Sequence, residues 1–265
     1  MCIGALLAAL SCIPSVAAAQ PCAADRIDER VRISFVQDGD TLMLQDGRRL
    51  RLIGINTPEL GQRERGPQPG AIAARDRLRQ LVFANRQQLQ LRYDQERRDH
   101  YGRLLAHAFF ADGGNVVEQL LNEGAGTQLV VPPNVWQAGC YRESARAARA
   151  QGRGIWALPD YRPTPAERLT LRSEGFHILR GRVSHVSDSV SATWINLAGN
   201  VALRIERADL EQFRGFDFAA LPGRDIEAQG WIQVRNGQPR MTLRHPAALE
   251  ILVPGPAPAG NAPLE

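Results

Sequence analysis

The chain has 265 residues, of which 44% are hydrophobic and 23% are charged. This composition can bury a full core, which excludes an intrinsically disordered protein, and the length suits two domains better than one. The net charge of +4 is mild, and all 32 basic residues are arginines. A base-composition bias of the genome explains the arginine total, whereas phosphate binding by guanidinium groups explains only particular positions.

The first 19 residues have the features of a signal peptide. They carry no charged side chain, contain the apolar run Ile3 to Leu10, and end in Ala17-Ala18-Ala19, which fits an A-x-A cleavage site. Ala9-Leu10-Ser11-Cys12 is a weaker match to a lipoprotein site, and we favour soluble export over lipid anchoring. The apolar run is too short to span a bilayer, and no later segment reaches the required length. We expect a periplasmic or secreted monomer with no membrane span.

Two cysteines, Cys22 and Cys140, remain after the expected cleavage. An even number in an exported protein favours a disulfide, which for so long a loop would contribute roughly 3 to 5 kcal/mol in the chain-entropy model. The alternative is a pair of unrelated buried thiols. No histidine pair lies near them in the sequence, which argues against a zinc site.

The first half of the chain predicts a five-stranded barrel. Asp46-Gly47 is a hairpin signal, and Gly61 to Gly70 has the composition of a mobile loop. Five strands with a helix after the third fit an OB-type barrel. The strands are expected at 31–36, 41–44, 50–55, 87–93 and 103–110. The helices are expected at 71–84, with Ile72, Leu78, Leu81 and Val82 on the apolar side, at 116–122 and at 140–151.

The second half predicts a smaller barrel after a Pro-rich junction at 159–165. Five short apolar runs follow at 181–183, 193–197, 201–205, 225–232 and 241–243. With their Gly-Arg-Val opening and His245-Pro246 close, they resemble bacterial OB-fold nucleic-acid-binding domains. The fold class is therefore mainly β with α, as two OB-like barrels. We expect domains at 27–158 and 175–253 and a disordered tail at 254–265. Trp194 and Trp231 either stack on bases or, as is commoner for a strand tryptophan, pack in the core.

Three motifs carry chemistry, in this order along the chain. They are Asp38-Gly39-Asp40-Thr41, Arg51 to Glu59 with its Asn56-Thr57-Pro58-Glu59 end, and Asp99-His100-Tyr101-Gly102-Arg103. Asp and Thr oxygens suit a hard cation, arginines suit a phosphodiester, and a turn-held Glu suits activation of water. The ordered set resembles the thermonuclease family, whose domain is the staphylococcal-nuclease-like fold.

The resemblance implies roles for particular residues. Asp40 and the Thr57 carbonyl would bind Ca²⁺, Glu59 would activate the water, and Arg51 and Arg103 would bind the phosphate of DNA or RNA. His100 and Tyr101 match family positions near the nucleotide. The family's second carboxylate is replaced here by Asn56, a neutral oxygen ligand that calcium accepts but that should weaken its affinity.

Each motif alone also has an ordinary structural interpretation. Asp38 is typical of a tight turn, and Thr-Pro-Glu of a loop or a helix start. His107 lies in an apolar strand and is expected to pack in the core. Since Arg51 should share a strand face with Ile53 and Ile55, it must point into a polar pocket or carry a burial cost.

Two functions from different classes remain open. The leading one is an exported calcium-dependent nuclease whose second barrel holds substrate. The alternative, suggested by Asn56, is a catalytically weak nucleic-acid-binding protein, although such a protein would need the arginines and not Glu59. A third, an envelope scaffold, has no specific residue in its support.

Overall fold

The computed structural model describes residues 22–61 and 66–252. The expected signal peptide, the whole expected tail and residues 62–65 of the expected loop lie outside the described residues. Two separate hydrophobic cores are present, one built from residues between Cys22 and Ala145 and the other from residues between Ala166 and Leu249. The expectation of two OB-like barrels is confirmed, while the limits of the two domains stay a prediction. Ala166 and Leu169 already belong to the second core, ahead of the expected start at 175.

The first barrel closes in the strand order β1-β2-β3-β6-β5. Buried residues such as Val31 and Ile33 alternate with exposed neighbours along β1, because successive strand side chains point to opposite faces. β3 runs parallel to β6, and β1 closes the ring on β5. The strands are β1 (Glu29–Val36), β2 (Thr41–Leu44), β3 (Arg49–Leu52), β5 (Gln88–Arg92) and β6 (Leu104–Phe109).

The expected single strand at 50–55 is wrong, because the chain turns at Ile53. β3 ends at Leu52, and β4 (Gly54–Asn56) pairs with β7 (Thr127–Leu129) in a separate two-stranded sheet. Gly54 has φ +100°, and a Cβ there would lie 2.4 Å from the Tyr141 ring. Only glycine satisfies both the positive φ and the contact. Arg51 and Ile55 therefore do not share one strand.

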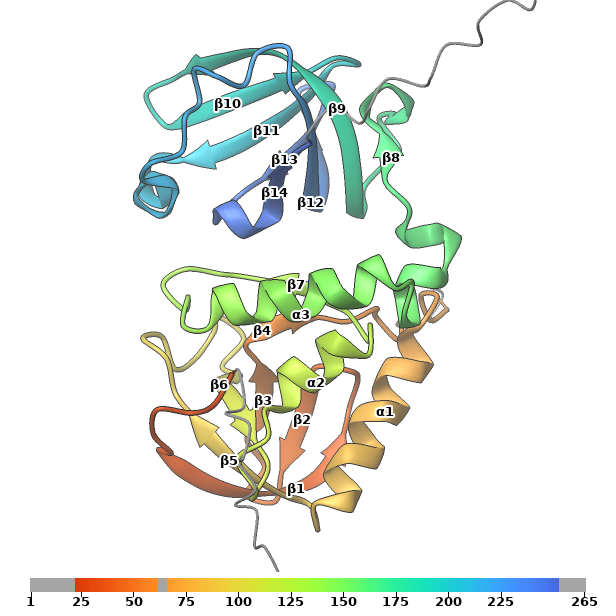
Figure 1. Ribbon diagram of the computed structural model, residues 1–265, viewed down its shortest axis with the longest axis vertical. Helices are drawn as coiled ribbons and strands as arrows, with labels where there is room; N and C mark the ends of the chain where they lie inside the picture. The colour runs from red at the N-terminus through yellow and green to blue at the C-terminus, as the bar shows by residue number, and fades with distance from the viewer. Residues whose placement is uncertain (1–21, 62–65, 253–265) are drawn as a thin grey trace, which may run out of the picture.

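Helices cover one side of the first barrel (Figure 1), α1 (Ala71–Ala84), α2 (Val116–Asn122) and α3 (Ala138–Ala150). The limits of α1 and α2 agree with the sequence prediction. Asn115 caps α2 by accepting hydrogen bonds from the amides of Val117 and Glu118. Ile72 is 50% exposed, so its placement on the buried side is wrong. Instead, Ala71 and Ala74 face the core, since their small side chains let the helix approach closely.

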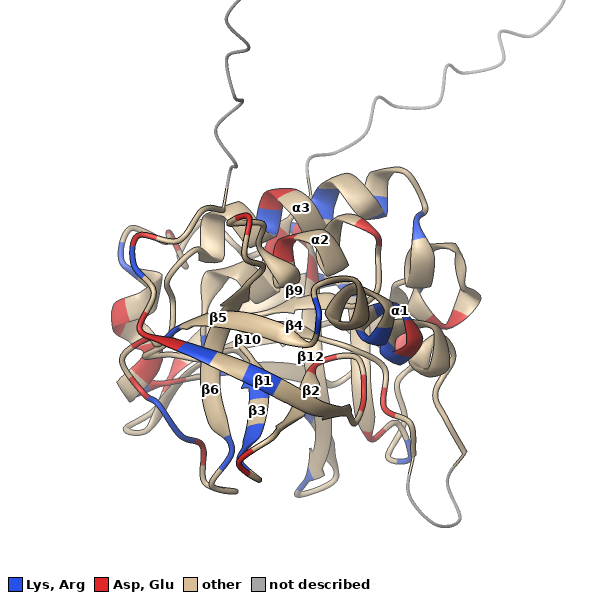
Figure 2. Ribbon diagram, turned by 90° about the horizontal axis from the view of Figure 1, so that it is seen from below, with Lys and Arg blue, Asp and Glu red and all other residues tan. Residues whose placement is uncertain are grey.

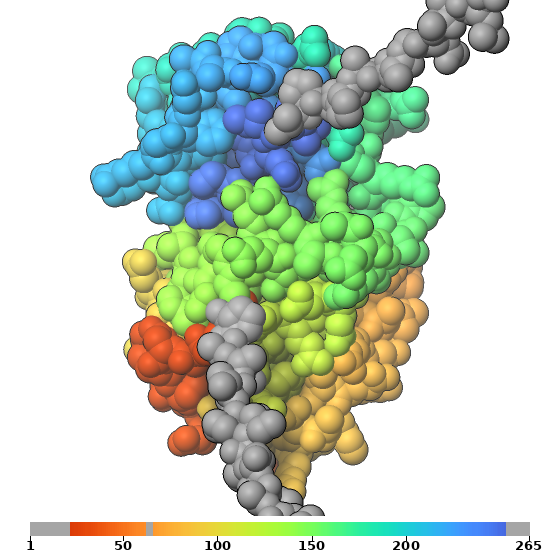
Figure 3. Space-filling view, viewed as in Figure 1, coloured from red at the N-terminus to blue at the C-terminus, as the bar shows by residue number. Residues whose placement is uncertain are grey.

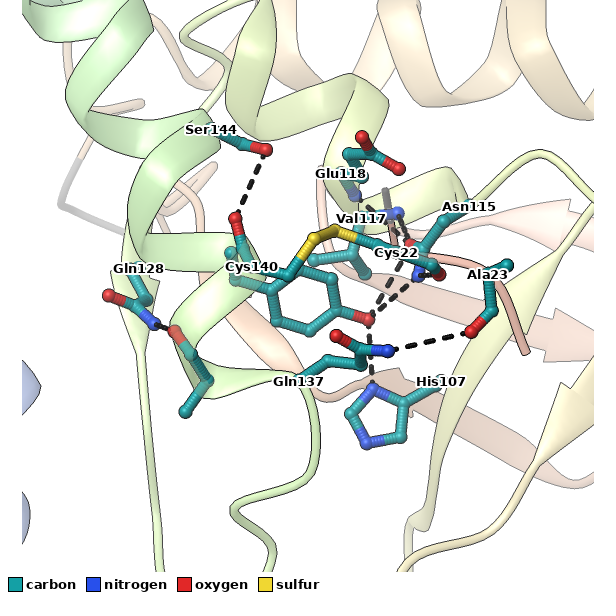
Figure 4. The surroundings of a disulfide bond; sticks show 12 residues. Cys22, Ala23, His107, Asn115, Val117, Glu118, Gln128, Gln137, Cys140 and Ser144 are labelled. Carbon is teal, nitrogen blue, oxygen red and sulfur yellow. Dashed lines mark hydrogen bonds between the residues drawn. A yellow bond between two sulfur atoms is a disulfide. The ribbon is translucent and has the colours of Figure 1, made fainter. Parts of the chain in front are cut away.

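A disulfide joins Cys22 to Cys140, with 5.9 Å between their Cα atoms. The predicted pairing is confirmed. Figure 4 shows it beside Asn115, whose Nδ2 donates to the Cys22 carbonyl (3.0 Å). His107 is fully buried, and its Nδ1 lies 2.9 Å from the Tyr141 hydroxyl. It packs in the core, as expected, and burial lowers its pKa.

The second barrel repeats the topology of the first. Its ring order is β9-β10-β11-β13-β12, its third and fifth strands are parallel, and its first and fourth close the ring. Its strands are β9 (Gly175–Asp188), β10 (Ala192–Leu197), β11 (Val201–Glu206), β12 (Asp225–Arg235) and β13 (Gln238–Thr242), flanked by β8 (Thr164–Pro165) and β14 (Leu249–Ile251). Short 3-10 helices complete the chain, η1 (Gly154–Ala157), η2 (Pro159–Tyr161), η3 (Ala166–Arg168), η4 (Arg207–Phe213) and η5 (Pro246–Ala248).

The two barrels meet across α3 and β7, which lie between them in Figure 1. The space-filling view shows the second barrel, in blue, packed directly on this green layer (Figure 3). Glu227 of β12 is buried and pairs with Arg149 of α3 and with Arg180. Gln229 Nε2 donates to the Gln128 carbonyl of β7 (3.0 Å). Because these partners are fixed on regular elements, the second barrel is held in a defined position.

Candidate active site

An acidic turn between β1 and β2 forms one end of the site. Asp38 Oδ1 accepts a hydrogen bond from the Asp40 amide (3.0 Å), the turn that its sequence predicts. Asp40 is 6% exposed. Its Oδ1 accepts from the Thr41 hydroxyl (3.1 Å), and its Oδ2 from the amide (2.9 Å) and hydroxyl (3.1 Å) of Thr57. Burial and the Asp40 carboxylate raise the pKa of Asp38 to about 6. Two carboxylates are thus forced close together in a partly buried place.

Arg51 extends from β3 to this acidic turn. Its Nη2 lies 3.1 Å from Asp40 Oδ2, and its side chain is 12% exposed. Nη1 donates to the Leu52 carbonyl (2.6 Å). Of the two outcomes expected for Arg51, a polar pocket or a burial cost, the structure shows polar partners, although strand alternation with Ile55 does not explain them. The ion pair with Asp40 compensates part of the burial of both charges.

Glu59 follows the Thr57-Pro58 turn. Its backbone is fixed by Gln68, whose Oε1 accepts from the Glu59 amide (2.8 Å) and whose amide donates to the Glu59 carbonyl (2.9 Å). Its side chain lines a cavity that Arg51 and Arg103 also line. Burial by the surrounding walls and the charge of Asp40 raise the pKa of Glu59, against the opposite effects of Arg51 and Arg103. A carboxylate with a raised pKa is a better proton acceptor near neutral pH.

Arg103 enters from the start of β6 and is oriented by Asp99. Asp99 Oδ2 accepts from Arg103 Nε (2.7 Å), and Oδ1 accepts from the amides of Tyr101 and Arg103. Burial alone would raise the pKa of Asp99, but the hydrogen bonds from Arg103 lower it. The Arg103 guanidinium lies 5.5 Å from the centre of the Tyr101 ring, and His100 packs on Tyr101. Asp99 belongs to a motif we identified, yet its orienting contact only becomes evident in three dimensions.

One cavity of about 880 Å³ joins these groups. It is lined by every expected site residue except Thr57, namely Asp40, Arg51, Asn56, Glu59, His100, Tyr101 and Arg103. Thr57 is 3% exposed and lies behind Asp40, which it supports by two hydrogen bonds. Its role as a carbonyl ligand stays a prediction. Sequence reasoning assigned no role here to Arg49 or Arg244, which also line the cavity. In Figure 2 the basic and acidic segments are interspersed along the ribbon, so the charge at the site comes from the residues that line it.

The ligand chemistry of this wall fits a hard cation. Asp38, Asp40, Asn56 and Glu59 offer carboxylate and amide oxygens, which calcium and magnesium prefer, and no sulfur. Within residues 22–61 and 66–252, no hydrogen bond engages the Asn56 side chain. The carboxylates of the cavity do not form a tight cluster. Among the described residues, three His, Cys, Asp or Glu ligand atoms come within 4.8 Å of one another only at Cys22, Glu118 and Cys140. Those two sulfurs form the disulfide and offer no thiolate.

Comparison with known families matches residues 49–158 to the family described as staphylococcal nuclease homologue. The chain is 36% identical over 129 residues to endonuclease YncB of Bacillus subtilis (strain 168), across 47% of this chain and 60% of that protein. It is 35% identical over 136 residues to the SPbeta prophage-derived endonuclease YokF of the same organism, across 49% and 45%. It is 32% identical over 131 residues to a thermonuclease of Staphylococcus intermedius, across 48% and 76%.

The matches to these relatives cover the first barrel and not the whole chain. The family match ends at residue 158, before the second barrel, and the alignments span 60% and 45% of the two Bacillus proteins. The thermonuclease is nevertheless covered over three quarters of its length. The ordered motifs, the barrel that brings them to one cavity and this match agree, and we conclude that the chain belongs to the staphylococcal nuclease homologue family.

Proposed function

We propose that the protein is an exported, metal-dependent nuclease that hydrolyses phosphodiester bonds in DNA, RNA or both. The observation that carries the proposal is a single cavity lined by Arg51, Glu59 and Arg103 beside the Asp40 carboxylate. Phosphodiester hydrolysis needs charge neutralisation, a positioned water and a proton acceptor, and this wall offers groups for each. Relatives named as endonucleases and thermonucleases add support.

In this proposal, Glu59 takes a proton from the water that attacks phosphorus. As the new P–O bond forms, the bond from phosphorus to one sugar oxygen breaks, and that oxygen takes a proton from solvent. Its raised pKa strengthens it as a base, and the Gln68 hydrogen bonds keep its backbone in place. Arg51 and Arg103 donate to the nonbridging oxygens, where charge develops in the transition state. Asp99 holds the Arg103 guanidinium in orientation, so little freedom is lost when substrate binds.

Calcium is the ion that we propose for the site, with Asp40, Asn56 and Thr57 as its ligands. Bound there, it would neutralise charge on the phosphate oxygens. Asp38 is a further oxygen donor on the same turn, and its proximity to Asp40 concentrates negative charge that a cation would relieve. A neutral Asn56 lowers the ligand charge, so we expect weak affinity.

Export is the cellular setting that we propose. The Cys22–Cys140 disulfide supports it, because such bonds persist in oxidising compartments. In residues 22–61 and 66–252, no helix combines the length and apolar character that crossing a bilayer requires.

A second candidate function, nucleic-acid binding with little catalysis, is favoured by one observation, the neutral Asn56 on the metal side of the cavity. One assay separates the two. Purified protein is incubated with plasmid, single-stranded DNA and RNA, each in calcium, magnesium or chelator. A nuclease cuts at least one substrate and stops in chelator. Binding without cleavage under every condition would contradict the hydrolase and leave the binding protein.

A further inference from the structure

Trp231 of the second barrel is exposed and lines the cavity of the first. Nine large apolar side chains are exposed in the described part of the chain, and three of them, Tyr101, Val131 and Trp231, line this one cavity. Trp231 is 44% exposed. A single exposed apolar side chain is normal, but several large ones gathered on one cavity are typical of a binding site, because a ligand that covers them gains the free energy of apolar burial. The expectation that this tryptophan packs in a core is wrong.

The register of β12 directs Trp231 toward the first barrel. Glu227, Gln229 and Trp231 alternate along the strand, so they share its outer face. The first two bind Arg149 of α3 and the Gln128 carbonyl of β7. Ala228 and Ile232 on the other face are 1% and 2% exposed in the second core. The contacts that dock the second barrel therefore also position the indole at the cavity.

The Trp231 ring has an aromatic neighbour but no polar partner. Phe176 packs against it in a T-shaped contact with 5.3 Å between ring centroids. Trp194 of the same barrel differs. Its indole N–H donates to Ser189 Oγ (3.1 Å), and Arg240 and Arg204 lie 5.0 and 5.8 Å from its ring. Within residues 22–61 and 66–252, the Trp231 indole makes no hydrogen bond and no cation-π contact. Trp194 is satisfied within the protein, and Trp231 is available to a ligand.

Two further arginines line the cavity together with these exposed aromatic side chains. Arg244 of the second barrel lines the same cavity and is held by Asp209 (3.2 Å) and by the Pro132 carbonyl (3.2 Å). Arg49 of β3 lies on the cavity as well, with Nη2 bonded to the Tyr101 carbonyl (3.3 Å). Fixed guanidinium groups beside exposed aromatic rings are the combination that binds single-stranded nucleic acid, whose bases stack and whose phosphates pair.

We propose that Trp231 stacks on a base and that Arg244 binds a phosphate of a single-stranded nucleic acid whose scissile phosphate lies at Arg51 and Arg103. The inference deepens the proposed function and rests on it for the identity of the ligand. A duplex fits poorly, because its base faces are covered by neighbouring bases, and the cavity has the volume of a pocket for a small ligand. The second barrel thereby makes the site selective for unpaired substrate.

Binding is measured separately from cleavage. In the Glu59→Gln background with calcium, the affinity for a labelled single-stranded oligonucleotide is compared for Trp231, Trp231→Ala and Trp231→Phe. We expect Trp231→Ala to weaken binding by roughly tenfold, and Trp231→Phe to retain most of it. Phe83→Ala is the matched control, an aromatic that is 72% exposed on α1 away from the cavity. An oligonucleotide with phosphates but no bases should bind Trp231 and Trp231→Ala equally, and duplex should show little difference.

The outcomes distinguish this inference from the hydrolase proposal. Base stacking is overturned if the protein with Trp231 and the Trp231→Ala variant bind the single strand with equal affinity. It is also overturned if Trp231→Ala weakens binding of the oligonucleotide without bases as much as binding of the single strand. Either result holds even if the wild-type protein cuts nucleic acid. The expected binding pattern in a protein that cuts nothing contradicts hydrolysis and supports the stacking site. Absence of binding by the Glu59→Gln protein with Trp231 intact overturns the stacking site, and the cleavage assay of the wild-type protein then decides the hydrolase proposal. Thermal melting of each variant checks folding, since a melted variant would lose affinity for every probe alike.

Discussion

The two barrels share one ring topology but use their charged residues differently. In the first, Asp40, Arg51, Glu59 and Arg103 open into a cavity of about 880 Å³. In the second, the buried carboxylates Asp209 and Glu227 are each paired with arginine, namely Arg244 for Asp209 and both Arg149 and Arg180 for Glu227. Asp40 and Asp99 are paired as well, with Arg51 and Arg103, but these pairs and Arg244 line the cavity, where a substrate can reach them. Glu227 and its two arginines do not line it and instead fix positions. This difference supports our proposals that the first barrel carries the chemistry and that the second positions the substrate.

The two barrels differ in the connection between their third and fourth strands. The first inserts β4 and α1 between its third and fourth strands, whereas the second inserts η4 at the corresponding point. The first is also tied by the Cys22–Cys140 disulfide. The motif Asn56 to Glu59 lies in the larger insertion of the first barrel. A longer connection on the same frame thus holds the residues for which we propose metal binding and catalysis.

Glu59→Gln gives the largest expected effect and tests whether the chemistry belongs to the first barrel. We expect turnover to fall by about 100-fold or more with little change in oligonucleotide affinity, because the amide keeps the shape but cannot take a proton. Steady-state kinetics and a binding titration measure the two effects. Glu143→Gln is the control, the same change at an exposed position of α3 outside the cavity. Full turnover in Glu59→Gln would end the general-base role.

Loss of the disulfide should change stability and leave the chemistry intact. We expect reduction, or Cys22→Ala with Cys140→Ala, to remove roughly 3 to 5 kcal/mol from the free energy of unfolding, since the bridge closes a loop with a sequence separation of 118. Urea unfolding measures it, and activity of the folded protein at low temperature serves as the control. An unchanged unfolding midpoint would show that the bridge adds no constraint to the first barrel.

Arg51→Ala and Arg103→Ala should each lower kcat/KM by more than about tenfold, because charge-assisted hydrogen bonds strengthen as charge develops on the phosphate. Steady-state kinetics with a single-stranded substrate measures the loss. Arg79→Ala, at a position that is 66% exposed on α1, is the matched control. Wild-type kinetics for Arg103→Ala would mean that the phosphate binds elsewhere in the cavity.

Asn56→Asp should produce the smallest effect, and it is the only substitution here that should increase calcium affinity. A second carboxylate raises the ligand charge, so we expect the half-activating calcium concentration to fall severalfold. A calcium titration of activity measures it. Asn236→Asp adds the same charge in the exposed β12–β13 turn and should leave the titration unchanged. If Asn56→Asp also leaves it unchanged, this side chain does not contact the ion.

Local patterns were sufficient for much of the fold and for the composition of the site. The limits of α1, α2 and β2 follow from apolar periodicity and turn residues, which act within a few positions of the chain. The motifs identified residues that the barrel brings to one cavity, because β3 pairs with both β2 and β6, next to Asp40 and Arg103. The pairing of Cys22 with Cys140 also followed, since only two cysteines remain after the expected cleavage.

Contacts between distant parts of the chain decided the rest. The strand breaks at Ile53 and Gly54 because Tyr141, far along the chain, packs against Gly54. Ile72 is exposed because α1 approaches the core through its alanines. Trp231 belongs to the cavity because Glu227 and Gln229 bind Arg149 and Gln128 of the first barrel. Such contacts leave no periodicity in the sequence, since each depends on which distant surfaces meet in the folded protein.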